Sequence, residues 1–178
     1  MTVVVASLQL QTPCSVAESW ERPPRVINYY LQQKFGDNEL GMVPAARAPV
    51  NGTNMGFGLE VVYEFVMTKK ASPRSRVLGY VRGTAIVVNN TAGATTFFVQ
   101  NVIHYDSGRR RGTLSQQGEA IFGPTPWESR WEFAVVGGTG IFRNAHGFNS
   151  GRFVSLTPTP TGNLVTTHYE ASLFYLHS

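Results

Sequence analysis

From Val26 onward the chain is a series of runs rich in Val, Ile, Tyr, Phe and Thr, separated by Gly, Asn and Pro. No segment keeps a helical period for more than a turn or two. Short strands at regular spacing, with turn residues between them, are typical of an antiparallel sandwich or barrel. We therefore predict an all-β fold. Eight runs meet the pattern, at residues 26–33, 57–66, 77–89, 94–105, 112–122, 131–137, 146–155 and 164–176.

Eight strands suit a closed antiparallel barrel, whose interior is filled by side chains or holds one small ligand. The 178 residues are enough for one domain with a full hydrophobic core. Residues 1–24 contain three prolines and no sustained periodicity, so we predict an N-terminal extension followed by a barrel domain at 25–178. The long connection at 35–56 is rich in Gly, Pro and Asn, and we expect a surface loop able to cover a barrel mouth.

The net charge of +4 does not predict a nucleic-acid-binding protein. The basic residues gather at 69–76 and 109–111, beside Ser, Pro and Gly, and this context indicates solvated turns. A nucleic-acid groove would interleave such charges with exposed aromatic side chains. No apolar run reaches 18 residues, so we predict no membrane-spanning helix.

Metal and disulfide chemistry have no support in the sequence. Cys14 is the only cysteine, so no intrachain disulfide can form. The four histidines show no close pair at metal-ligand spacing, so we predict no metal site. The N-terminal apolar stretch has no preceding positive residue and is a poor secretion signal. Asn51 and Asn89 lie in glycosylation sequons, which are weak evidence for secretion.

A glycine cluster follows the apolar run 133–136, with Gly137, Gly138 and Gly140 inside four residues. Glycine accepts positive φ without steric cost, so we predict a strand entering a tight backbone reversal. A phosphate-binding loop is excluded, because the spacing is not Gly-x-Gly-x-x-Gly and no amphipathic helix follows.

Several segments resemble the plant dirigent family. The strongest match is Val135-Val136-Gly137-Gly138-Thr139-Gly140-x-Phe142-Arg143-x-Ala145-x-Gly147, preceded by Glu132. Further matches lie at 27–33, 57–64, 77–83 and 111–114, so the resemblance runs from about residue 26 to the end.

The resemblance implies an eight-stranded antiparallel barrel, usually a homotrimer, similar to allene oxide cyclase. Family members capture phenolic substrates of phenylpropanoid metabolism and orient two phenoxy radicals, so that coupling yields one stereoisomer of a lignan. A separate oxidase makes the radicals, and the dirigent protein carries no metal or redox cofactor. Most members are exported to the plant apoplast. Because this chain lacks a convincing signal, a cytoplasmic location is the alternative.

The chain departs from the family at several polar positions. Gln32 and Gln33 stand where a His-Asp pair is usual, and Glu64-Phe65 replaces an adjacent Asp pair. The remaining departures are Ala85 and Val87 in place of two tyrosines, Ile141 in place of an Asp, and His146 in place of an Arg. The substrate is therefore not specified by the resemblance.

Glu64 is the leading candidate for a catalytic acid. Among apolar neighbours on its strand, a buried carboxyl would have a raised pKa and could donate a proton. The alternative is a solvent-facing residue at a strand end. His146 is the second candidate, because an imidazole exchanges protons near neutral pH, although a structural role is equally consistent with the sequence.

The substrate-binding candidates are mainly aromatic side chains, which can stack on a flat phenol. Core packing explains the same residues equally well. Alternation means that His104 and Tyr105 cannot both face inward, and Arg143 can instead fix the glycine corner. The set is Tyr30, Gln33, Phe65, Phe98, His104, Tyr105, Phe133, Ile141 and Arg143.

Three functions remain open at this point. The first is a non-oxidative guide for stereoselective phenoxy coupling. The second is a dehydratase or cyclase that acts on a quinone-methide-type intermediate, with Glu64 as the general acid. The third is a stress-response module that binds a ligand without converting it.

Overall fold

The computed structural model describes residues 23–35, 40–43, 55–90, 95–122, 125 and 129–176, and within these ranges all regular structure is β. No helix there could span a membrane. The strands are β1 (Val26–Phe35), β2 (Leu40–Val43), β3 (Glu60–Thr68), β4 (Val77–Asn89), β5 (Thr95–Asp106), β6 (Arg111–Phe122), β7 (Arg130–Gly140), β8 (Ala145–Thr159) and β9 (Gly162–Tyr175).

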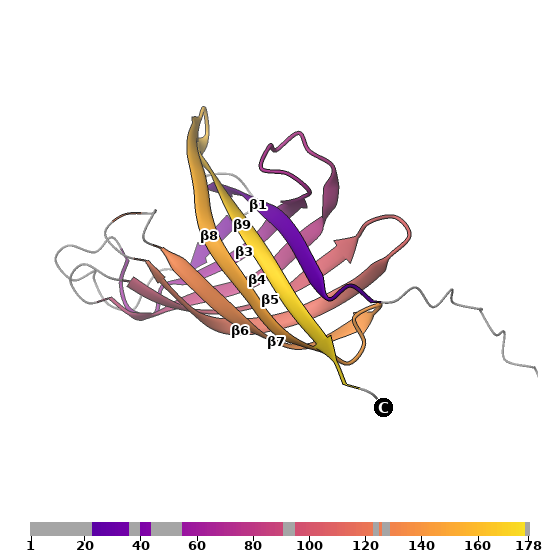
Figure 1. Cartoon of the computed structure of the whole chain (residues 1–178). Coiled ribbons are helices and arrows are strands. Elements are labelled where there is room, and N and C mark those ends of the chain that lie inside the picture. Colours follow the sequence, from indigo (N-terminus) through magenta and orange to yellow (C-terminus); the bar gives the residue numbers. More distant parts are fainter. Residues whose placement is uncertain are drawn as a thin grey trace, which may run out of the picture.

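The strands form one antiparallel sheet that closes on itself. Strands β3 to β9 pair in sequence order, and β1 pairs with β9 on one side and with β3 on the other. Eight strands thus form a closed barrel, as predicted, while β2 adds to the free part of β3 beyond β1. Figure 1 shows the strands tilted around the barrel and the β8–β9 hairpin reaching past its neighbours.

The seam between β1 and β3 is short and is reinforced by a side chain. Only Tyr30 to Gln32 pair with β3. The Gln32 amide nitrogen donates to the Thr68 hydroxyl at 3.0 Å and to the Ala71 carbonyl at 3.1 Å. Thr166 on β9 donates to the Gln32 amide oxygen at 3.1 Å. Gln32 therefore bonds to both strands that flank β1.

Most predicted strand limits agree with the structure to within a few residues. The prediction missed β2, which lies inside the expected loop at 35–56, and the rest of that loop lies largely outside the described residues. It also ended β7 too early, because pairing with β6 continues through Gly138 and Gly140. A Cβ on Gly138 would lie 2.6 Å from both the Phe142 and Thr113 carbonyl oxygens, so only glycine fits this close approach.

The chain reverses after β7 at residues 141–144, where Asn144 has φ 62°. Phe142 from this turn is fully buried, and its ring meets Tyr105 edge-on at a centroid distance of 5.6 Å. The turn therefore closes this end of the barrel, where the core is packed solid. The core at this end also contains Ile27, Met67, Leu78, Ile103, Leu114, Val135, Ala145, Ala171 and Leu173.

Candidate functional site

The other half of the barrel is hollow. A cavity of about 440 Å³ lies between inward-facing side chains of the barrel strands, within the size range of small-molecule sites. Its described wall is mainly aliphatic and aromatic. The apolar lining consists of Leu31, Met55, Val61, Phe65, Val81, Ala85, Phe97, Val99, Ala120, Phe122, Trp131, Phe133, Phe153, Leu156 and Val165, and the polar lining of Gln33, Tyr63, Asn101, Gln116, Ser129, Thr167 and Tyr169.

Polar side chains form the inner end of the cavity. Tyr63, Gly83, Asn101 and Gln116 occupy one register row across β3 to β6. The Asn101 amide nitrogen donates to the Tyr63 hydroxyl at 2.8 Å, across the intervening strand β4. This bond is possible because Gly83 has no side chain, and a Cβ there would lie 2.3 Å from Asn101 Cβ. The absence of a side chain at Gly83 therefore allows Tyr63 and Asn101 to form one polar site.

The polar layer continues below the cavity. The Asn149 amide nitrogen donates to the Gln116 amide oxygen and to the Tyr29 hydroxyl, both at 2.7 Å. Tyr29 stacks on Tyr169 with a centroid distance of 5.2 Å and an interplanar angle of 6°. These hydrogen bonds separate the cavity from the solid core at the closed end.

Three buried tyrosines in and below the cavity, Tyr29, Tyr63 and Tyr169, are neutral at pH 7. Burial raises the pKa of Tyr63 to about 12. Burial also raises the pKa values of Tyr29 and Tyr169, and charge repulsion adds to both shifts, from Tyr169 on Tyr29 and from Tyr63 on Tyr169. Each hydroxyl can therefore donate a hydrogen bond at neutral pH but cannot serve as an anionic base.

No charged side chain lines the cavity in the part of the chain that the structure describes. A charged ligand would have to lose its hydration without gaining a counter-charge, which costs several kcal/mol. The cavity thus suits a neutral, largely aromatic ligand. The described residues also contain no group of His, Cys, Asp and Glu that could hold a metal ion.

Three predicted binding residues lie at the cavity, namely Gln33, Phe65 and Phe133. Phe65 stacks on Tyr63 at a centroid distance of 4.6 Å, and the Gln33 amide nitrogen donates to the Thr167 hydroxyl at 2.9 Å.

The predicted position of Glu64 inside the cavity is wrong. Along β3 the cavity-facing residues are Val61, Tyr63 and Phe65, so alternation turns Glu64 to the outer surface. There its carboxylate pairs with the Arg82 guanidinium, and the two side chains are 43% and 55% exposed.

Three further candidates, Tyr30, Phe98 and His104, also lie on the outer surface. Each is next in the chain to a residue that faces inward: Leu31 follows Tyr30, Phe97 and Val99 flank Phe98, and Ile103 precedes His104. The Tyr30 ring packs against His168 at a centroid distance of 4.9 Å, and Phe98 is 39% exposed.

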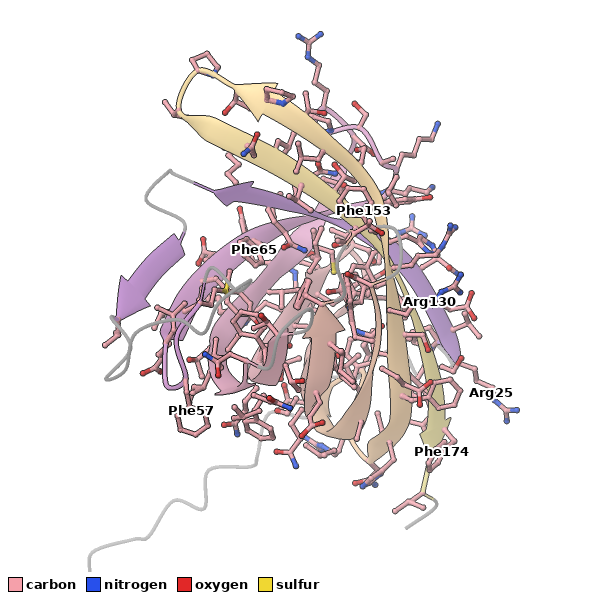
Figure 2. The ribbon with its side chains drawn as sticks, turned by 90° about the vertical axis from the view of Figure 1, so that its left-hand side faces the viewer. Arg25, Phe57, Phe65, Arg130, Phe153 and Phe174 are labelled. Carbon is pink, nitrogen blue, oxygen red and sulfur yellow. The ribbon has the colours of Figure 1, made fainter. Side chains whose placement is uncertain are left out.

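The glycine motif lies at the closed end, opposite the hollow half. The candidates near it, Tyr105, Ile141, Arg143 and His146, therefore do not line the cavity. Tyr105 and Ile141 pack against the core, and Arg143 is exposed. His146 Nδ1 lies 3.3 Å from the Asn144 carbonyl oxygen. Figure 2 shows Phe174, which stacks on His146 at 6.2 Å, projecting from this end.

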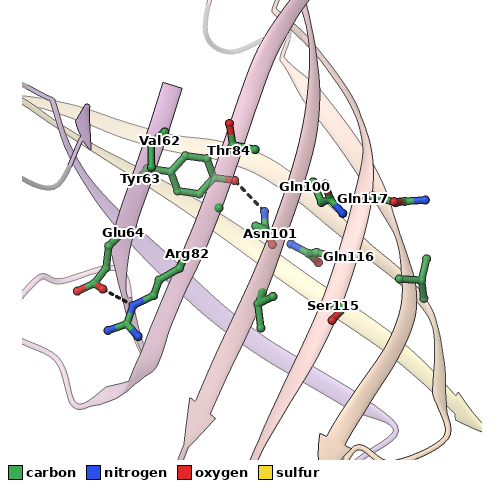
Figure 3. Close-up of a pocket in the computed structure, with 13 residues that line it drawn as sticks. Val62, Tyr63, Glu64, Arg82, Thr84, Gln100, Asn101, Ser115, Gln116 and Gln117 are labelled. Carbon is green, nitrogen blue, oxygen red and sulfur yellow. Dashed lines mark hydrogen bonds and ion pairs between the residues drawn. The ribbon is translucent and has the colours of Figure 1, made fainter. Parts of the chain in front are cut away.

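A second depression, of about 720 Å³, lies over the outer face of β3 to β7 (Figure 3). The Glu64–Arg82 pair borders it, together with the exposed side chains of Val62, Gln100 and Gln117. Such a surface cannot exclude water from a reactive intermediate. We therefore take the interior cavity as the candidate site.

The cavity lining also includes five residues that the sequence patterns did not predict, namely Tyr63, Asn101, Gln116, Trp131 and Tyr169. The sequence does contain a pattern that indicates Asn101. It occupies every second position of one strand together with the apolar residues Phe97, Val99 and Ile103, so it shares their face. A polar side chain within such an apolar register must be buried.

The fold and the site define a closed barrel with a polar-floored, otherwise apolar ligand cavity. The family model described as Dirigent-like protein matches residues 26–174. The chain therefore belongs to the dirigent-like family, as its sequence motifs predict.

Among solved structures, the pterocarpan synthase dirigent protein GePTS1 is similar with a TM-score of 0.69 and 19% identity, over 86% of this chain and 85% of that chain. The pterocarpan synthase dirigent protein PsPTS1 is similar with a TM-score of 0.69 and 20% identity, over 86% of this chain and 96% of that chain. A pyocyanin demethylase is similar with a TM-score of 0.56 and 18% identity, over 84% of this chain and 99% of that chain. No curated protein matched the sequence. At these identities the structures support the fold alone.

Proposed function

We propose that the protein binds a neutral phenolic radical or intermediate in the barrel cavity and directs its stereoselective coupling. The observation that carries the proposal is the cavity of about 440 Å³, aromatic and aliphatic in its walls and without a charged lining residue among those described. Aromatic walls offer stacking partners for a flat phenol. The described lining also contains no carboxylate or histidine to act as a general acid or base, which favours a guide over an acid–base catalyst.

Selectivity in this mechanism comes from the shape of the cavity. If two approach geometries differ by about 1.4 kcal/mol, one product is favoured about tenfold. A separate oxidase would generate the radicals, and the membership of the dirigent-like family supports this division of labour. The proposal includes a homotrimer, an apoplastic location and a lignan-type product, as the family resemblance implies.

The test is co-incubation of the protein with an oxidase and a panel of monolignols, followed by chiral analysis of the dimers. The proposal predicts an enantiomeric excess with at least one monolignol, and a racemic product when the protein is omitted. Racemic dimers throughout the panel would contradict it.

A dehydratase or cyclase is the second candidate, and the family context supports keeping it, because two similar structures are named as pterocarpan synthases. Its general acid cannot be Glu64, which lies on the outer surface. The Tyr63 hydroxyl is the proton donor that the cavity offers in its place. This candidate predicts turnover of a closed-shell phenol without any oxidase.

A further inference from the structure

The Tyr63–Asn101 pair at the cavity floor has hydrogen-bonding capacity that the described protein does not use. The Asn101 amide oxygen is buried and has no hydrogen-bond partner in the described structure. The Tyr63 hydroxyl accepts the Asn101 amide proton at 2.8 Å, and no acceptor for its own proton is found among the described residues. Asn101 as a whole is only 6% exposed. The Asn101 amide oxygen therefore lacks a donor, and the neighbouring Tyr63 hydroxyl lacks an acceptor, among the described residues.

From this pair we infer that the cavity floor binds an un-ionised hydroxyl group of an aromatic ligand. The inference rests on the proposed function and adds which group of the ligand is anchored. That group is a hydroxyl that keeps its proton, either the hydroxyl of a closed-shell phenol or a second hydroxyl of the radical, because a phenoxy oxygen has no proton to donate. A hydroxyl oxygen accepts from Tyr63 while its proton is donated to the Asn101 amide oxygen. Three hydrogen bonds then close a ring in which every group both donates and accepts.

The choice of a hydroxyl does not depend on which amide atom faces Tyr63. If the Asn101 oxygen and nitrogen exchange places, Tyr63 donates to the amide oxygen and the amide nitrogen becomes the free donor. The ligand oxygen then accepts from Asn101 and donates to Tyr63. The ring reverses its direction, and the same hydroxyl completes it.

Other ligand groups fit less well. An ether oxygen can accept from Tyr63 but leaves the Asn101 oxygen without a donor, and a buried unpaired acceptor is costly. A phenolate has the same defect and also carries a charge, and no lining residue in the described part of the cavity could neutralise it. Apolar side chains such as Val99 and Phe133 surround the rest of the ligand. The floor therefore selects for a free hydroxyl on an otherwise apolar molecule.

The test compares 4-propylphenol with 4-propylanisole, which differ by one methyl group on the oxygen. Binding is measured by calorimetry at pH 7, where the phenol is neutral. We expect the wild-type protein to bind the phenol about tenfold more tightly than the ether, as a buried hydrogen bond of ordinary strength implies.

Tyr63→Phe and Asn101→Leu should each reduce this preference to about onefold to threefold. Gln100→Leu is the matched control, since Gln100 neighbours Asn101 but is exposed on the outer face, and it should keep the wild-type preference. The wild-type comparison and Tyr63→Phe decide the matter even if Asn101→Leu does not fold. Equal wild-type affinity for the two compounds would overturn the inference but leave the proposed function standing. Binding of neither compound would overturn both.

Discussion

Asn101 donates a 2.8 Å hydrogen bond to the Tyr63 hydroxyl across a strand that carries only a glycine, Gly83, at that level. The polar floor of the cavity depends on the absence of a side chain at Gly83. A Cβ on Gly83 would lie 2.3 Å from Asn101 Cβ and 2.3 Å from the Gln100 carbonyl oxygen, too close for any relaxed packing. The glycine is therefore a structural requirement of the site.

We expect Gly83→Ala to lower the free energy of unfolding by about 1–3 kcal/mol, the usual cost of overpacking. The measurement is urea unfolding followed by circular dichroism. Gly137→Ala is the matched control, because no atom lies within 4 Å of a Cβ built there. A destabilisation by Gly83→Ala no larger than that of the control would contradict the close approach.

The turn residue Phe142 seals the closed end of the barrel. It is fully buried, so Phe142→Ala should cost about 3–5 kcal/mol through lost packing and a new cavity. Thermal or urea unfolding measures this loss. Arg143→Ala, next in the chain but exposed, should change stability by less than about 0.5 kcal/mol. If Arg143→Ala proves the more damaging variant, the guanidinium fixes the corner after all.

Substitution of Glu64 tests whether a carboxylate on the outer surface takes part in binding or coupling. Its ion pair with Arg82 is about half exposed, and such pairs contribute at most about 1 kcal/mol. Glu64→Gln should therefore leave both the enantiomeric excess and ligand affinity unchanged. Loss of either in a folded variant would mean that the outer surface takes part in the reaction.

Alkaline pH should destabilise the protein through its buried tyrosines. Burial raises the pKa of Tyr63 from 10.0 to about 12 in the folded chain. A raised folded-state pKa stabilises the protein fully below the unfolded value, and this stability is lost as the pH rises through the folded value. We expect the urea midpoint to fall above about pH 10. The fall should be smaller in Tyr63→Phe than in Tyr80→Phe, whose side chain lies on the outer surface; equal falls would be inconsistent with this account.

The sequence predicted the barrel because each of its eight strands, β1 and β3 to β9, has a recognisable local pattern. Apolar alternation identified β4 at its observed limits, Val77–Asn89, and the glycine motif identified the family. The short β2 escaped because four residues carry too little pattern. The end of β7 was misplaced because Gly138 and Gly140 are selected by close approach to neighbouring backbone, which is a tertiary effect.

The candidate site was predicted less well, for a physical reason. Alternation assigns Tyr63 and Glu64 to opposite faces but does not say which face is inside. A carboxylate looked the more reactive group, yet burial of an unpaired charge is the costlier choice. The apolar members of the same register, Val61 and Phe65, mark the inner face and assign Tyr63 to it.

The most direct test of the account is the effect of filling the cavity on stereoselectivity. Ala85 lines the cavity, whereas Ala134 is exposed on the outer face of β7. With an oxidase and the monolignol that gives the largest enantiomeric excess, we predict that Ala85→Leu lowers the excess at least severalfold and that Ala134→Leu retains it. An unchanged excess with folded Ala85→Leu would show that the coupling is not controlled inside the barrel.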